Sequence, residues 1–237
     1  MEGKDVARRA VALALALATI ASLGCAPRSD RVVLEIRIQQ NMDQILFSDF
    51  GEPPQTAIWL EDPATHRLRT VFVTWRSGAG EWKGKSECPP ALPRWFQVYR
   101  TETGRKGLPT PQHPAPDAVT KATPLKKHFA AKADVAPCTK WVCWIEVNIS
   151  ADFNEHFQQY DEKTQTMDTH FSGQPSLVYR AEITATPGER VVLTPYAYTQ
   201  PDSPTGTLVR DLKPITTAKT LFKAIEITVR RPRFRLF

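Results

Sequence analysis

The chain has 237 residues, of which 41% are hydrophobic and 24% are charged, with a net charge of +6. This composition is typical of a globular protein, and it excludes a disordered tail and a polytopic membrane protein. The twenty prolines outnumber the eleven glycines, which favours β-structure with rigid turns over a helical bundle.

Residues 1–24 have the organisation of a secretory signal peptide. A basic segment precedes the apolar run at 11–20, and small residues follow it. The run is shorter than the roughly 20 residues that a transmembrane helix needs. We therefore expect the chain to be exported, where it meets no nucleic acid, and its scattered positive charge to be ordinary solvated surface.

The end of this leader resembles a bacterial lipobox. Leu23 and Gly24 stand directly before Cys25, although Ser22 replaces the usual leucine. The resemblance implies cleavage after Gly24 and lipidation of Cys25, and two or more acyl chains anchor a protein stably. Because Ala26 is not the aspartate of an inner-membrane retention signal, we expect the protein at the periplasmic face of the outer membrane.

Residues 25–31 form a polar tether, and residues 32–237 read as a single β-domain with several strands in chain order. Alternating or β-rich runs occupy 32–39, 56–60, 68–75, 141–149, 177–183, 190–198 and 225–229. The second and third of these runs flank turn-forming residues and predict a hairpin. The sequence thus predicts an all-β fold, an antiparallel β-sandwich of the immunoglobulin-like kind.

Two segments between these strands differ in pattern. In 92–100, Trp95, Val98 and Tyr99 recur at helical spacing just after a proline, which predicts one short helix. Residues 101–124 contain five prolines among polar residues and predict a long loop.

The strand at 141–149 alternates strictly. Cys143 and Ile145 belong to one face, whereas Trp144 and Glu146 belong to the other. Because Cys143 is on the apolar face, we expect a buried thiol with no catalytic role.

Three cysteines remain after Cys25, and an oxidising compartment permits one disulfide among them. An extended chain separates the Cα atoms of Cys138 and Cys143 by about 16 Å, which exceeds the roughly 7 Å limit for a bridge. We therefore predict the pair Cys88 and Cys138, both in proline-flanked segments. A turn between Cys138 and Cys143 would instead permit that pair.

Several segments resemble a bacterial family of periplasmic domains of unknown function. They are residues 56–62, 68–71, 92–95, 117–124 and 144–148. The resemblance covers residues 31–186 and implies an immunoglobulin-like sandwich, in a family often encoded near flavin-transferring or haem-containing membrane redox proteins. It carries over no catalytic residue, and residues 187–237 extend beyond it.

Two groups of side chains are candidate binding sites. Trp75, Trp82 and Trp95 would line a pocket for a flavin or haem. The second candidate is a cation site formed by the side-chain oxygens of Asp152, Asn154 and Glu155. Calcium suits such donors, but the spacing is not that of an EF-hand, and Asp152 and Asn154 could instead cap a turn.

The sequence favours a non-enzymatic interaction module without a cofactor, anchored to the membrane by its lipid and bound to a periplasmic or membrane protein. The resemblance suggests a membrane redox system as that partner. The alternatives are an exported metal-dependent hydrolase and a carrier of flavin or haem. The basic and apolar C-terminal segment 230–237 would lie on anionic lipid or pack on the sandwich edge.

Overall fold

The computed structural model describes residues 31–46, 53–81, 91–115, 126–168, 171–201 and 203–232. The predicted signal peptide, the lipidation residue Cys25, the disulfide partner Cys88 and the pocket residue Trp82 lie outside the described residues. No helix of the described ranges is long and apolar enough to cross a membrane.

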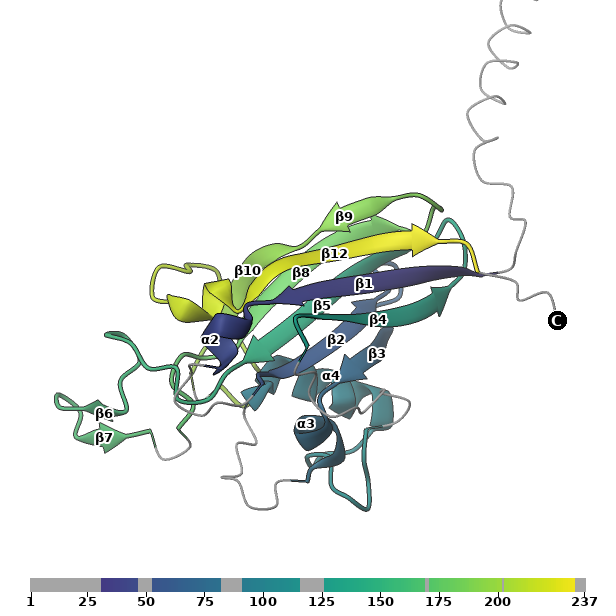
Figure 1. The fold of residues 1–237 in the computed structure, drawn as a ribbon. Helices are drawn as coiled ribbons and strands as arrows, with labels where there is room; N and C mark the ends of the chain where they lie inside the picture. The colour runs from purple at the N-terminus through teal and green to yellow at the C-terminus, as the bar shows by residue number, and fades with distance from the viewer. Residues whose placement is uncertain are drawn as a thin grey trace, which may run out of the picture.

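Two antiparallel sheets pack face to face (Figure 1). The four-stranded sheet has the order β4-β1-β12-β9. Its strands are β1 (Val32–Gln40), β4 (His128–Val135), β9 (Arg190–Val192) and β12 (Phe222–Arg230). The six-stranded sheet has the order β11-β10-β8-β5-β2-β3. Its strands are β2 (Gln55–Glu61), β3 (Leu68–Val73), β5 (Lys140–Asn148), β8 (Leu177–Thr184), β10 (Thr194–Thr199) and β11 (Leu208–Val209).

Short helices and a small hairpin complete the described fold. The helical segments are α2 (Met42–Leu46), α3 (Trp75–Ala79), α4 (Pro93–Thr103) and the 3-10 helix η2 (Thr217–Thr220). The hairpin is formed by β6 (Tyr160–Asp161) and β7 (Thr166–Met167), and it projects from the body of the molecule in Figure 1. The predicted all-β antiparallel sandwich is therefore confirmed.

The main core lies between the two sheets. From β1, Leu34, Ile36 and Ile38 are buried in it, as their alternation predicts. From β5, Cys143 and Ile145 are fully buried in the same core. The expectation of a buried thiol at Cys143 is confirmed, and burial raises the pKa of this thiol to about 12, which disfavours the thiolate.

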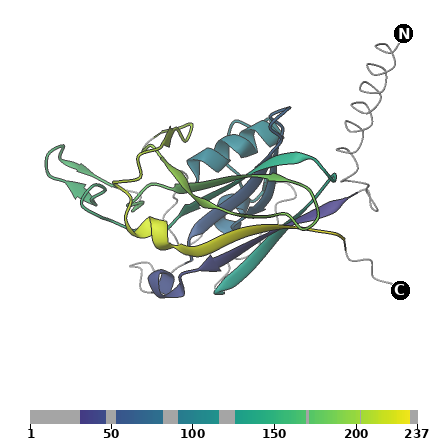
Figure 2. The same cartoon turned by 90° about the horizontal axis from the view of Figure 1, so that it is seen from above.

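A second core covers the outer face of the six-stranded sheet. Helix α4 contacts β2 and β3 there, and its Trp95, Val98 and Tyr99 are buried, which confirms the helix predicted from their spacing. Figure 2 shows α4 and the four-stranded sheet on opposite sides of the six-stranded sheet. The six-stranded sheet is therefore buried on both faces over the part that α4 covers.

The expectation of one helix was wrong, because α2, α3 and η2 are also present. The strand predicted to reach Trp75 ends at Val73, and Trp75 begins α3. Gln55 explains this early end, since its Oε1 accepts hydrogen bonds from the hydroxyls of Thr74 (2.8 Å) and Ser77 (2.9 Å). Satisfying these buried groups holds the chain in a turn where β-propensity alone favours extension.

The two ends of the sandwich differ in what they carry. Because Val33 pairs with Arg230 in antiparallel register, β1 begins at the end where β12 ends. The turns at 62–67, 136–139 and 185–189 lie at this end, which we call the terminal end. The other end, which we call the distal end, carries α2, the β6–β7 hairpin and the loop before η2.

Candidate functional site

Aromatic and arginine side chains form a row across the outer face of the six-stranded sheet, and the row begins at two tryptophans of the second core. Trp59 of β2 stands opposite Trp144 of β5, which stands opposite Arg180 of β8. Directly opposed residues of antiparallel strands share a face and lie about 5 Å apart. Tyr196 of β10 and Arg210, just after β11, continue the row.

Ring contacts join the members of this row. Trp59 and Trp144 are stacked with their ring centroids 6.2 Å apart. Trp144 and Tyr196 are perpendicular to each other, with their ring centroids 5.6 Å apart. The guanidinium carbon of Arg180 lies 5.4 Å from the Trp144 ring centroid, and that of Arg210 lies 3.6 Å from the Tyr196 ring centroid. Such cation–π contacts fix the guanidinium planes over the rings.

Exposure increases along the aromatic–arginine row. Trp59 is 2% exposed and Trp144 is 9% exposed, whereas Tyr196 and Arg180 are half-buried and Arg210 is exposed. The buried tryptophans thus form a rigid base. The accessible part of the row is formed by Tyr196 and the two arginines.

Carboxylates contact the row at two places. The indole Nε1 of Trp144 donates to Oε2 of Glu61 at 2.9 Å, which fixes the tryptophan. Arg180 pairs with Glu182 at 2.6 Å. Arg210 forms no ion pair with any residue of the described ranges, so it retains the capacity to bind an external carboxylate.

Next to Trp144 on the same outer face, Glu146 of β5 is fully buried beneath the start of α4. Its carboxylate accepts hydrogen bonds from the backbone N–H groups of Arg94 (3.2 Å) and Trp95 (2.6 Å) and from the hydroxyl of Ser176 (2.6 Å). Burial raises the pKa of Glu146 from 4.5 to about 7, against the opposing effect of these donors. The carboxyl group therefore satisfies the helix N-terminus and fixes α4 to the sheet.

The predicted tryptophan pocket is not formed by its described members. Trp95 is buried in the second core, where its Nε1 donates to Thr70. Trp75 is 43% exposed on α3, and its Nε1 donates to Glu81. The local sequence around a core tryptophan does not differ from that around a surface tryptophan, so both residues were predicted at one site.

The predicted calcium ligands also take separate partners. Asn154 Oδ1 accepts the backbone N–H groups of His156 and Phe157, both at 2.9 Å, which is the turn-capping alternative. Asp152 Oδ1 accepts a hydrogen bond from the hydroxyl of Thr217, and Glu155 is exposed. No group of three or more His, Cys, Asp or Glu side chains that could hold a metal is found in the described part of the chain.

An open hollow of about 750 Å³ lies next to this region. It is lined by Glu155, His156, Gln158, Tyr160, Asp161, Glu162 and Lys163. These side chains are mostly exposed and belong to the projecting hairpin and the segment before it. The hollow lacks the apolar lining that small-molecule sites usually have.

The cysteines decide one of the two predicted pairings. Cys143 is free and buried, so the alternative Cys138–Cys143 bridge is wrong. Cys138 lies in the turn between β4 and β5 and is disulfide-bonded, with a partner outside the described residues. The pairing of Cys88 with Cys138 stays a prediction.

Comparison with protein families, with curated proteins and with solved structures finds no match for this chain. The functional interpretation of the row and of Glu146 therefore depends on their geometry alone. The sequence signal for the row is weak: Arg180 alternates with inward apolar residues of β8, as any surface residue would, and Tyr196 follows a proline in β10. Only the strand register brings them beside Trp144.

Proposed function

We propose that this protein is an exported, lipid-anchored β-sandwich that acts as a non-enzymatic interaction module at the periplasmic face of the outer membrane. The leader and Cys25 supply the anchor. The aromatic–arginine row supplies the binding surface, and its partner is a protein that offers a carboxylate and an apolar side chain. The family resemblance suggests a membrane redox protein in this role.

The observation that carries the proposal is the exposed Arg210 held 3.6 Å from the centroid of Tyr196, on a rigid base of tryptophans. Tyr, Trp and Arg are the residue types that dominate the binding energy of protein interfaces. A pre-arranged guanidinium loses little conformational entropy when it binds a carboxylate. Both features favour recognition of a protein over catalysis.

The binding surface is tested by crosslinking in intact cells, followed by capture of the full chain and identification of the attached protein. Arg210→Glu and Tyr196→Ala should abolish the crosslinked product. Arg105→Glu is the matched control, because Arg105 is also an exposed arginine and lies in the loop after α4. Equal capture of one product by all these variants would reject the row as the binding surface.

The anchor is tested separately by fractionation. Cys25→Ser removes the thiol that would carry the lipid, so this variant should move from the membrane to the soluble periplasmic fraction. Membrane association that persists in Cys25→Ser, with a fully processed leader, contradicts lipid anchoring.

A further inference from the structure

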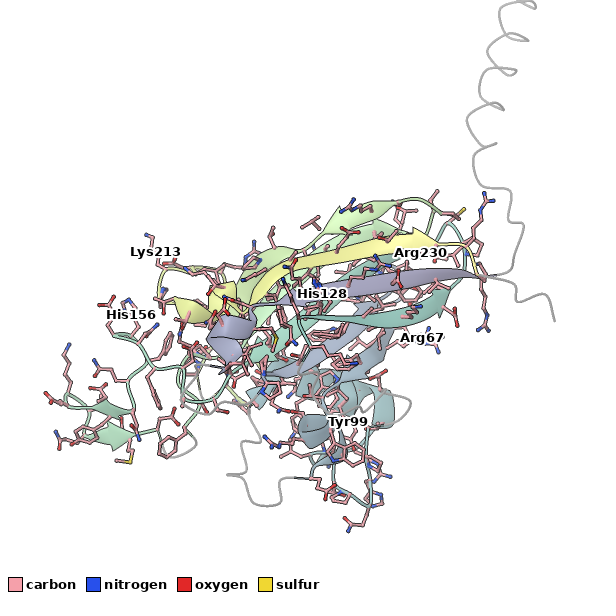
Figure 3. All side chains as sticks on the ribbon, in the orientation of Figure 1. Arg67, Tyr99, His128, His156, Lys213 and Arg230 are labelled. Carbon is pink, nitrogen blue, oxygen red and sulfur yellow. The ribbon has the colours of Figure 1, made fainter. Side chains whose placement is uncertain are left out.

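The terminal end of the sandwich is rich in exposed basic side chains. They come from separate segments that the register brings together: the start of β1, the β2–β3 turn, the start of β5 and the segment after β12. These residues are Arg31, Arg67, Lys140 and Arg231. Figure 3 shows Arg67 and Arg230 toward one end of the molecule and Lys213 and His156 toward the other.

Three of these four side chains have no ion-pair partner in the part of the chain that the structure describes. Arg67, Lys140 and Arg231 form no ion pair with any described residue. Arg230, by contrast, is paired with Glu35 at 2.6 Å. Among the acidic residues of this end, Asp62 Oδ1 accepts the N–H of Ala64 at 2.8 Å, whereas Asp134 is exposed.

The distal end carries charges of both signs. Its acidic side chains include Asp43 at α2, Glu155 and Glu162 around the hairpin, and Asp211 before η2. Its exposed basic side chains include Lys126, Lys163 and Lys213. The distal lysines therefore stand among carboxylates.

The proposed anchor fixes which end meets the bilayer. Six residues, 26–31, separate Cys25 from Val32, the first residue of β1, and the resulting seven Cα–Cα steps span at most about 25 Å. An acylated Cys25 would thus keep the terminal end, and not the distal end, close to the headgroups. The sequence after Arg231 adds Arg233 and Arg235.

We propose that the terminal end is a membrane-contact surface that binds the anionic headgroups of the bilayer through Arg67, Lys140 and Arg231. Its orientation rests on the proposed lipid anchor, whereas its affinity for anionic lipid does not. Contact at this end holds the sandwich upright. The aromatic–arginine row on the outer face of the six-stranded sheet then stays accessible to a partner beside the membrane.

The test uses the unacylated chain 26–237, which keeps every described residue. It is mixed with vesicles of phosphatidylcholine alone or of phosphatidylcholine with about 30% of anionic phosphatidylglycerol. Sedimentation should show binding to the anionic vesicles only, weakening with salt. Because each basic residue near an anionic surface contributes about fivefold in partitioning, the combined changes Arg67→Glu, Lys140→Glu and Arg231→Glu should weaken binding about 100-fold or more.

The matched control carries the same charge change at the distal end, with Lys126→Glu, Lys163→Glu and Lys213→Glu, all exposed residues. It should keep most of the affinity, and circular dichroism should show both triple variants folded. Equal binding to neutral and anionic vesicles would overturn the proposal, and so would equal weakening by the two triple variants. Neither result bears on Cys25 or on the partner of the row, so the anchor and the interaction module are judged by their own experiments.

Discussion

Each sheet carries one buried glutamate on the outer face of a central strand, and the two carboxylates are satisfied in different ways. Glu35 of β1 is paired with Arg37 (3.1 Å), Lys132 (3.5 Å) and Arg230 (2.6 Å). Glu146 of β5 accepts two backbone N–H groups of α4 and one hydroxyl. The first site remains beside solvent, and the second lies beneath a helix.

The residues on the neighbouring strands explain the difference. Lys132 stands directly opposite Glu35, so charged side chains reach the carboxylate from within the sheet. Ala57 and Val178 stand opposite Glu146 and offer no donor. A carboxylate on such an apolar face needs donors from above the sheet, and the N-terminus of α4 supplies them. The cross-strand neighbours therefore decide which face stays open and which one a helix covers.

Removing the buried carboxylate should have the largest effect. Glu146→Ala leaves the N–H groups of Arg94 and Trp95 and the hydroxyl of Ser176 without their acceptor. We expect the free energy of unfolding to fall by about 3–5 kcal/mol, as when one partner of a buried charged network is removed. Urea denaturation followed by tryptophan fluorescence measures this loss. A loss below about 1 kcal/mol would show that α4 does not depend on this carboxylate.

The disulfide comes next, because Cys138 lies where the chain passes from the four-stranded sheet to the six-stranded sheet. Cys138→Ser should lower the free energy of unfolding by about 2–4 kcal/mol under oxidising conditions. Under reducing conditions the variant and the original protein should be equally stable, which serves as the control.

Mass spectrometry of non-reduced peptides identifies the partner of Cys138. We expect a peptide that joins Cys88 to Cys138. A peptide that joins Cys25 to Cys138 would contradict this pairing and also the anchor, because a thiol in a disulfide cannot carry a thioether-linked lipid. A link between Cys25 and Cys138 is a real alternative, because Val32 pairs with Val135 at the same end of the sandwich.

The stability of the protein should depend on pH through Glu146. Burial raises its pKa from 4.5 to about 7, so between these pH values the folded protein holds a proton that the unfolded chain releases. The free energy of unfolding should therefore fall as the pH rises from about 4.5 to 7, by up to roughly 3 kcal/mol. Denaturation at several pH values measures the slope.

Glu146→Gln removes the titrating group and keeps an oxygen acceptor, so it should flatten this slope. Contributions from groups that both proteins share cancel in the difference. An unchanged slope in Glu146→Gln would assign the pH dependence to other groups.

The smallest effect is expected at the open glutamate. Glu35→Ala frees three basic side chains that can all reach water, since the side chains of Arg37, Lys132 and Arg230 are 53%, 64% and 40% exposed. We expect a loss of about 1 kcal/mol or less, measured by the same urea denaturation. A loss as large as that of Glu146→Ala would remove the distinction between the two faces.

Much of the architecture follows from the sequence, because alternation and turn residues act over a few neighbouring positions. The inward face of β1, the hairpin of β2 and β3, the inward Cys143 and the helix that carries Trp95 were all predicted in this way. The early end of β3 at Val73 was missed. It depends on Gln55, which lies on a neighbouring strand and accepts hydrogen bonds from two hydroxyls of the turn.

The sequence by itself determined the β-sandwich and the two faces of its central strands, because burial of apolar side chains with a period of two needs only local order. The tertiary structure alone decided that Arg180, Tyr196 and Arg210 join the tryptophans, and that Glu146 receives the start of α4. These groups come from segments far apart in the chain. Only the register of distant strands, set by packing of the whole core, brings them within contact distance.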